Sequence, residues 1–263
     1  RSRRQRQMCI RDSIMTLIKK LCLSAFLAAA LAACVSTQEM NAKAYAGYAQ
    51  MKQQNARAID TTSSTARRIH TVFNRMKPYA EKANTTGVPF QWEITVFRTN
   101  ELNAWAMAGG KMGFYTGLVD RLKMTDDEIA TVMGHEMAHA LKEHSKSAHN
   151  FEMTTGIFGA IADAAASAAL GADTGGLLST GTDLIANKPF SRSQETEADE
   201  IGLMLMAESG YNPSAAPNVW VKMSKESGGS GGIFSTHPSN EDRQENLERL
   251  IPEAMKLYKA SKR

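Results

Sequence analysis

The spacing of apolar residues along the chain predicts a mixture of helices and short strands. In residues 65–83 apolar side chains recur every three or four positions, which is typical of an amphipathic helix. These side chains are Ile69, Val72, Phe73 and Met76. Residues 91–97 alternate between apolar and polar side chains and predict a strand. Residues 103–117 predict two further short strands that meet at Gly109 and Gly110.

Two later helices carry recognisable ends. Thr125, followed three residues later by Glu128, forms a capping box, so we expect a helix to begin there. A second helix is expected over residues 191–210, because this segment ends in a glycine that is soon followed by a proline. Residues 151–187 are rich in Ala and Gly and predict a small-residue helix with a mobile loop. A pair of helices is expected after residues 236–243.

The segment that starts at Met15 has the anatomy of a secretory signal. A short basic stretch is followed by an apolar run, residues 21–30, and then by small residues before Cys34. The apolar run is too short to span a bilayer, which takes about 20 residues. Its end resembles the lipobox of bacterial lipoproteins, where the peptide is cleaved before a cysteine that becomes lipidated. We therefore expect residues 15–33 to be a lipoprotein signal peptide, with an uncleaved anchor helix as the alternative.

Residues 1–14 precede this signal. The stretch from Arg3 to Ser13 resembles the in-frame translation of a transposase sequencing adapter. We therefore interpret residues 1–14 as adapter-derived sequence. A natural basic extension is the alternative.

The net charge changes sign once residues 1–33 are set aside. The full chain has 31 Lys and Arg against 27 Asp and Glu, a formal net charge of +4. Seven of these basic residues and one acidic residue lie in residues 1–33, which leaves 24 against 26, a net charge of −2. No nucleic-acid partner is therefore expected. Of the three cysteines only Cys34 remains, so no disulfide is expected either.

Residues 135–139 form an H-E-x-x-H motif on the capped helix. His135 and His139 lie one turn apart on one helix face, so both imidazoles can reach a single metal ion. Glu136 can then act on water at that metal as a general base. His144 is the nearest candidate for a third ligand. On a continuous helix it projects about 180° away from His135, so we expect a surface or C-terminal-turn histidine and not a ligand.

A second acidic pair offers a better third ligand. Glu195 and Asp199 are four residues apart on one face of the second helix, whereas Glu197 points about 200° away from Glu195. Glu195 can bind the metal, and Asp199 can accept a hydrogen bond from the far nitrogen of a ligand histidine. The alternative is a solvated acidic start of a helix, which is favourable for the helix dipole alone.

These motifs together resemble the HtpX/BepA/CAAX-prenyl-protease family of gluzincin zinc metallopeptidases. The resemblance runs from about residue 90 to residue 249 and rests on the stretches NAWAMAGGKMGFYTGLVDRL, GHEMAHALKEH, FSRSQETEADEIG and STHPSNEDR. It implies an α+β, mainly helical, zincin-like domain over residues 63–263, with a small β-sheet beside the H-E-x-x-H helix. Residues 34–62 would precede it as a tether and N-terminal helix. Lipoprotein members carry a cysteine near position 111, where this chain has Lys111 and Met112, so a disulfide of those members is not expected here.

The resemblance also implies a role for each motif residue. The implied ligands of one zinc ion per chain are His135, His139 and Glu195. Glu136 would be the catalytic base, and Asp199 would hold a ligand histidine. His237 matches a histidine that in some relatives binds the metal as a fourth ligand or stabilises the oxyanion, so we group it with Glu136 as a candidate catalytic residue. A role at the entry of a helix, before Pro238, is the alternative.

Residues Ala108, Gly109 and Gly110 are candidates for contact with substrate. An extended peptide can add to the edge of a sheet near the metal, and glycines allow a substrate backbone to approach closely. A hairpin turn without substrate contact is the alternative.

The function expected from these features is that of a zinc-dependent endopeptidase anchored by lipid on Cys34 to a bacterial outer membrane, facing the periplasm. Its expected substrates, unfolded or misassembled periplasmic and outer-membrane proteins, follow from the resemblance alone. A chaperone-like outer-membrane assembly factor with a latched or structural zinc site is the main alternative. A zinc hydrolase of a non-peptide bond is a third. The sequence does not indicate whether the protein works with a partner protease or an assembly machinery.

Overall fold

The computed structural model describes residues 34–154, 189–227, 232–238 and 241–262. The chain divides into two compact units, one of residues 36–148 and 184–263 and one of residues 1–35 and 149–183. In the smaller unit the Val35 N–H donates a 2.8 Å hydrogen bond to Asn150 Oδ1. The expectations for residues 1–33 and for most of residues 151–187 lie outside the described residues. The fold and the site below belong to the larger unit.

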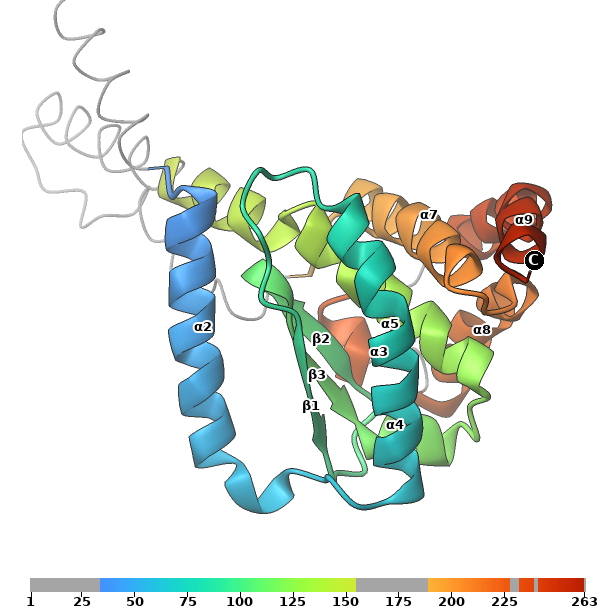
Figure 1. The fold of residues 1–263 in the computed structure, drawn as a ribbon, viewed down its shortest axis with the longest axis horizontal. Helices are drawn as coiled ribbons and strands as arrows, with labels where there is room; N and C mark the ends of the chain where they lie inside the picture. The colour runs from blue at the N-terminus through green and yellow to red at the C-terminus, as the bar shows by residue number, and fades with distance from the viewer. Residues whose placement is uncertain (1–33, 155–188, 228–231, 239–240, 263) are drawn as a thin grey trace, which may run out of the picture. The chain divides into compact units, whose positions relative to one another are not determined.

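A three-stranded sheet lies inside the larger unit (Figure 1). Its strands are β1 (Glu93–Phe97), β2 (Ala104–Met107) and β3 (Lys111–Tyr115), in the order β1-β3-β2. β1 is parallel to β3, and β2 is antiparallel to it. The three predicted strands are therefore confirmed. A single 3-10 turn, η2 (Ala108–Gly110), joins β2 to β3, and Gly109 there has a left-handed φ of 73° that favours glycine.

Helices cover both faces of the sheet. α2 (Thr37–Gln54), followed by η1 (Ala56–Ala58), lies along one face, and α3 (Ser64–Ala83) and α5 (Asp126–Leu141) lie on the other, with α4 (Thr116–Arg121) directly after β3 (Figure 1). Tyr48 of α2 is buried, and its hydroxyl lies 2.6 Å from Thr95 Oγ1 and 3.1 Å from the Met112 carbonyl oxygen. The predicted N-terminal helix is thus bonded to two strands of the sheet.

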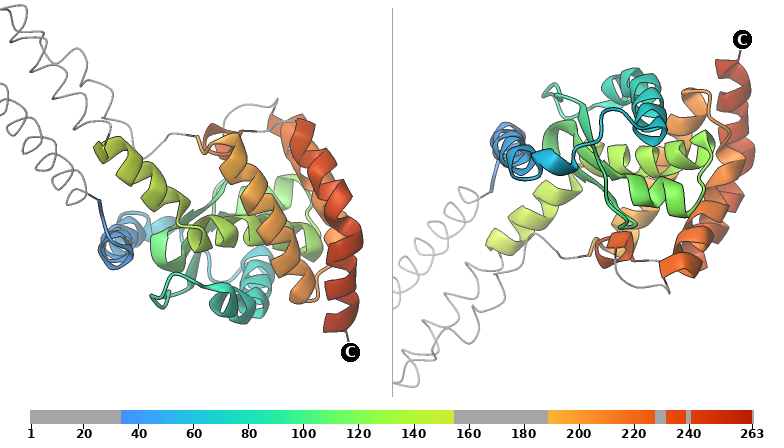
Figure 2. Two further views of the ribbon diagram at one scale, coloured as in Figure 1. Left: turned by 90° about the horizontal axis from the view of Figure 1, so that it is seen from above. Right: turned by 90° about the horizontal axis from the view of Figure 1, so that it is seen from below.

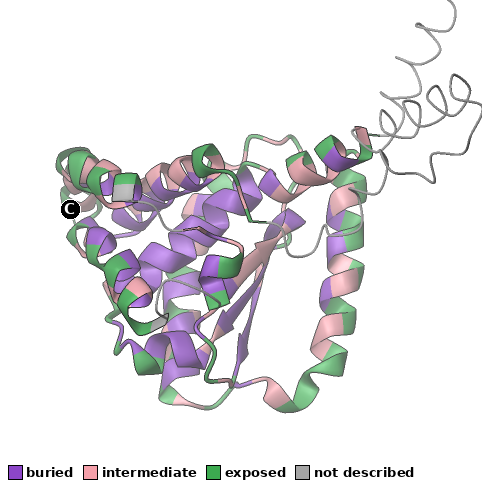
Figure 3. Ribbon diagram, turned by 180° about the vertical axis from the view of Figure 1, so that it is seen from behind, coloured by how far each residue is buried: buried purple, intermediate pink, exposed green. Residues whose placement is uncertain are grey.

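The predicted amphipathic helix and both predicted helix ends are present, since Gly210, with a φ of 78°, follows the C-cap of the helix Arg192–Glu208. α3 buries the four apolar side chains that the spacing singled out, Ile69, Val72, Phe73 and Met76. Thr125 and Glu128 form the expected capping box at the start of α5. Figure 3 shows α5 buried along almost its whole length, between the sheet and the later helices.

α7 (Arg192–Glu208) crosses α5 at a point where both helices carry glycine. A Cβ atom on Gly134 would lie 2.5 Å from the Gly202 carbonyl oxygen, and one on Gly202 would lie 2.6 Å from the Gly134 carbonyl carbon. The two backbones are therefore in direct contact here, which only a residue without a side chain allows. This contact brings the residues that follow Gly134 close to those that precede Gly202.

The C-terminal part differs from the expectation. After η4 (Pro213–Ala215), α8 (Ala216–Ser227) and η5 (Gly232–Ser235), the chain ends in one long helix, α9 (Glu241–Ser261), which lies beside α7 (Figure 2). The predicted pair of helices after residues 236–243 is wrong, because α9 continues through Pro252. Leu247 and Ala254 on either side of that proline are buried, so packing holds the helix together across it. No helix in the described ranges combines the length and apolar content needed to cross a membrane.

Candidate metal centre

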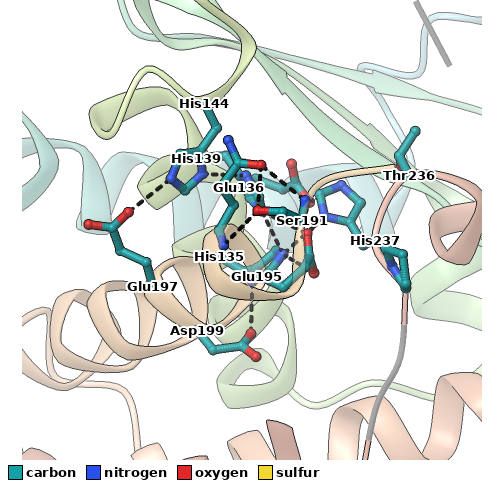
Figure 4. Close-up of polar contacts among 12 residues, drawn as sticks. His135, Glu136, His139, His144, Ser191, Glu195, Glu197, Asp199, Thr236 and His237 are labelled. Carbon is teal, nitrogen blue, oxygen red and sulfur yellow. Dashed lines mark hydrogen bonds and ion pairs between the residues drawn. The ribbon is translucent and has the colours of Figure 1, made fainter. Parts of the chain in front are cut away.

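α5 presents its two histidines toward the same point. His135 and His139 are buried, one turn apart, and their Nε2 atoms lie 3.0 Å from each other (Figure 4). The capping box at Thr125 fixes where the helix begins, and the contact between Gly134 and Gly202 fixes its distance from α7. The expected pair of imidazoles on one helix face is thus present.

α7 brings the predicted carboxylates to these rings. Glu195 Oε1 lies 3.3 Å from His139 Nε2, and Glu195 Oε2 lies 3.5 Å from His135 Nε2. Asp199 Oδ1 is 2.8 Å from His135 Nδ1. Because a carboxylate accepts, a neutral His135 ring carries its proton on Nδ1, which leaves the lone pair of Nε2 for a metal.

His237 joins the same cluster from the segment between η5 and α9. Its Nδ1 lies 3.0 Å from Glu195 Oε1 and 3.1 Å from His135 Nε2, and its Nε2 lies 3.4 Å from Glu136 Oε1. The backbone N–H of His237 donates to the carbonyl of Ile233 at 2.9 Å, which holds the segment in a tight turn.

The four donors fit one zinc ion. Single donor atoms of His135, His139, Glu195 and His237 all lie within 4.8 Å of one another. Neighbouring donors in tetrahedral zinc sites are about 3.3 Å apart, given bonds of about 2.0–2.1 Å. Five contacts among these four residues, which involve both oxygens of Glu195, lie between 3.0 and 3.5 Å and are close to that spacing. Two imidazole lone pairs facing each other at 3.0 Å also repel unless a cation or a proton lies between them.

The charges around His135 shift several pKa values in the metal-free protein. Burial lowers the pKa of His135, but the nearby carboxylates of Glu195 and Asp199 outweigh that effect and raise it to about 9. Burial raises the pKa of Glu195, yet the neighbouring His135, His139 and His237 hold it far below its usual range. A metal ion therefore competes with a proton for the same ring nitrogen.

Glu136 lies beside the donors without belonging to them. Its carboxylate is buried, and among the described residues Oε1 has no hydrogen-bond partner. Burial raises the pKa of Glu136, while His237, His135 and the backbone N–H of Ala106 act in the opposite direction. This carboxylate is buried beside the four candidate ligands, and one of its oxygens has no hydrogen bond to the described residues. It is therefore suited to take a proton from a reacting water.

Arg243 is a member of the site that the sequence analysis missed. It lies on α9, is buried, and its Nε and Nη2 bond to Asp199 at 2.6 and 2.8 Å. Its Nη1 lies 2.7 Å from Glu195 Oε2, and its guanidinium stacks 4.0 Å from the Trp220 ring centroid. Burial raises the pKa of Asp199, but Arg243 outweighs this and lowers it, so Asp199 stays charged. The residue belongs to the stretch STHPSNEDR, which was the one available signal.

The expectation that His144 lies at the surface is wrong, although it follows the end of α5 and stays outside the donor group, as expected. His144 is buried, its Nδ1 lies 2.9 Å from His139 Nδ1, and its Nε2 lies 3.0 Å from Glu197 Oε2 (Figure 4). The projection of about 180° assumed a continuous helix. α5 ends at Leu141, and the backbone reverses at Glu143, whose φ is 52°. Glu197, expected to point away from the site, contacts it through His144.

The structure gives Gly109 and Gly110 close neighbours within the protein. A Cβ atom on Gly109 would lie 2.5 Å from the Tyr45 ring, and one on Gly110 would lie 2.7 Å from the Trp92 ring. Side chains of the chain itself therefore lie against both glycines in the direction that a Cβ atom would take. Ala108 is buried as well. Among the described residues, the outer edge of β2 pairs with no other strand.

Comparison with known proteins gives one family and several relatives. Residues 63–251 match the model of peptidase family M48. The chain is 35% identical over 186 residues to the mitochondrial metalloendopeptidase OMA1 of Arabidopsis thaliana, covering 70% of this chain and 36% of that protein. It is 28% identical over 209 residues to the metalloprotease LoiP of Escherichia coli strain K12, covering 79% of each.

The alignment with a further relative covers a larger share of this chain than the two alignments above. The metalloprotease YcaL of Escherichia coli strain K12 is 29% identical over 235 residues, covering 88% of this chain and 87% of YcaL. By contrast, the chain spans only about a third to a half of the OMA1 proteins of Arabidopsis thaliana and Schizosaccharomyces pombe, 36% and 48%.

Proposed function

The chain belongs to peptidase family M48, as its motifs led us to expect, and we propose that it is a zinc-dependent endopeptidase. The observation that carries this proposal is one buried cluster. Three histidines and a glutamate surround a point that fits one zinc ion, and the carboxylate of Glu136 lies beside them. His135, His139 and Glu195 would hold the ion.

Glu136, Asp199 and Arg243 have different roles in the proposed peptide hydrolysis. When bound, zinc supplies a Lewis acid that polarises a carbonyl and makes water easier to deprotonate. Glu136 takes the proton from the attacking water and passes it to the nitrogen of the leaving amine. Asp199 holds the ring of His135, and Arg243 holds Asp199.

The outer edge of β2, which pairs with no other strand in the described part of the chain, is the proposed substrate-binding edge. β2 contacts α5, and the backbone N–H of Ala106 lowers the pKa of Glu136, so β2 runs beside the base. A peptide that adds to a sheet edge must be extended, which favours unfolded or misassembled proteins over folded ones. That these are periplasmic and outer-membrane proteins follows from the family resemblance. A Glu136→Gln variant incubated with envelope extracts should retain such substrates.

Casein hydrolysis by the purified protein tests the proposed activity. We expect cleavage that is abolished by a zinc chelator and restored when zinc is added back. The chaperone-like alternative draws its support from His237, which completes a set of four protein donors, because closed sets of four are typical of structural zinc sites. Zinc-loaded protein that protects casein from aggregation but never cleaves it would favour that alternative.

We further propose that the protein is anchored to the bacterial outer membrane through lipid on Cys34 and faces the periplasm. Cys34 is exposed, and stable anchoring takes more than one acyl chain, which bacterial lipoproteins provide. Val35 and Ser36 follow it, so the aspartate that typically retains lipoproteins at the inner membrane is missing. We expect the wild type in the outer-membrane fraction and a Cys34→Ser variant outside it. A variant that still sediments with the outer membrane would point to attachment through protein contacts.

His237 is expected to restrain the enzyme. An imidazole in the fourth position leaves no place open for water or a substrate carbonyl. The segment that carries it is held by one hydrogen bond to the chain before α7, which the Phe190 N–H donates to the Thr236 carbonyl at 2.9 Å. A His237→Ala variant should cleave unfolded casein at least as fast as the wild type and should digest itself more readily. A loss of about 100-fold, with zinc still bound, would instead assign His237 to oxyanion stabilisation.

A further inference from the structure

We propose that His144 and Glu197 are positioning residues that hold the His139 imidazole in the orientation and tautomer that zinc requires. His144 contacts the Nδ1 atom of His139 on one side and Glu197 on the other, in an unbroken line (Figure 4). The inference rests on the proposed zinc site. It concerns the affinity of that site for metal, which is measured independently of peptide cleavage.

Glu197 determines where the protons lie along this line. A carboxylate only accepts, so His144 carries its proton on Nε2 and donates it over 3.0 Å to Glu197 Oε2. The Nδ1 atom of a neutral His144 is then an acceptor, so the proton between the two rings belongs to His139 Nδ1. His139 therefore keeps the lone pair of its Nε2, the atom that lies 3.3 Å from Glu195 Oε1.

The end of α5 produces this geometry. Leu141 is the last helical residue, and the left-handed backbone of Glu143 turns the chain so that His144 returns to His139. Phe190 adds a second restraint, because its ring centroid lies 4.1 Å from that of His139 at an angle of 30°. A ring held by a hydrogen bond at Nδ1 and a stacked neighbour has little freedom to rotate away from the metal.

The two ligand histidines on α5 are thus supported in parallel but unequal ways. His135 donates directly to Asp199, which is buried and bonded by Arg243. His139 reaches its carboxylate through an intervening ring, and the Glu197 side chain at the far end is 41% exposed. Because Glu197 lies at the surface, it can be substituted with little effect on the packing of the buried core.

His144 is not itself a zinc ligand in this arrangement. Both of its ring nitrogens face other partners, His139 Nδ1 and Glu197 Oε2, on the side of His139 away from the metal donors. Among the described residues, the donor group accordingly consists of His135, His139, Glu195 and His237. Its effect on zinc must therefore pass through His139.

Competition with a chromophoric chelator measures the zinc Kd of the purified protein and its variants. We expect His144→Phe to raise Kd by about 10- to 100-fold, as for other residues that support a metal ligand. Glu197→Gln should raise it by less, since an amide oxygen still accepts from His144. His144→Gln should restore part of the affinity, because its carbonyl oxygen can accept from His139 Nδ1–H.

Lys142→Gln is the matched control. Lys142 Nζ lies 2.7 Å from Glu197 Oε1, so this variant removes an ion pair with the same carboxylate and leaves the His144 contact in place. We expect its zinc Kd to equal that of the wild type. Thermal unfolding of the metal-free proteins separates packing from positioning: Glu197→Gln should unfold at the wild-type temperature and still bind zinc more weakly.

The histidine tautomers give a direct readout, since the chain has only six histidines. In ¹H–¹⁵N spectra of the zinc-loaded protein we expect His144 to be protonated on Nε2 and His139 on Nδ1. A proton on His144 Nδ1 would overturn the inference. So would zinc Kd values within about twofold of the wild type for both His144→Phe and Glu197→Gln. A wild-type protein that binds no zinc at all would refute the zinc site and this inference together.

Discussion

A Glu136→Gln variant is expected to hydrolyse unfolded casein about 10²- to 10⁴-fold more slowly than the wild type while its zinc content stays the same. Glutamine has the shape of glutamate but cannot take a proton from water at neutral pH. Glu136 is also not among the four donors that surround the metal position. The variant should fold, because Glu136 Oε1 makes no hydrogen bond within the described part of the chain that folding would lose. Initial rates and elemental analysis of the same preparation check both expectations.

Glu81→Gln controls for the change from glutamate to glutamine itself. Glu81 lies on the surface of α3, where it pairs with Lys77 at 3.7 Å, so its loss should leave the rate unchanged. If Glu136→Gln retained activity within about threefold of the wild type, Glu136 would have to be removed from the mechanism. If it lost zinc together with activity, the residue would be a ligand and the base would have to be sought elsewhere.

The features that could be predicted from the sequence are those that depend on the spacing of residues a few positions apart. The capping box at Thr125 and Glu128, the strand alternation in residues 91–97 and the four-residue spacings of the two site helices all depend on neighbours a few residues away. A spacing of four places two side chains on one helix face whatever the rest of the fold does. The pairs His135 with His139 and Glu195 with Asp199 could therefore be predicted from the sequence.

The features that escaped prediction depend on where a helix ends or on which helices meet. His144 was misplaced because the projection around α5 was continued past Leu141. Arg243 was missed because only the packing of α9 against α7 brings it to Asp199. The contact between Gly134 and Gly202, which sets the distance between the two site helices, is likewise a fact of tertiary structure. Local periodicity contains none of this information.

A Glu195→Ala variant is expected to lose most of its zinc. Metal binding at four-ligand zinc sites contributes about 10–16 kcal/mol, or roughly 2.5–4 kcal/mol per ligand, so removing one should raise the zinc Kd about 10²- to 10³-fold. Glu195 is also the one anionic ligand among the four donors. Without its charge, the positive ion would face three neutral rings and the nearby Arg243 guanidinium, whose Nη1 lies 2.7 Å from Glu195 Oε2.

A second carboxylate on the same helix separates this effect from a general loss of charge. Glu200 lies five residues further along α7, with a side chain 42% exposed, and bonds to Asn246 at 2.9 Å, outside the donor group. Glu200→Gln should keep the wild-type zinc Kd and activity. Glu195→Gln keeps the volume and one oxygen, and it should fall between Glu195→Ala and the wild type in zinc affinity. Normal zinc content in Glu195→Ala would show that another residue is the third ligand, and His237, whose Nδ1 lies 3.1 Å from His135 Nε2, would be the first to test.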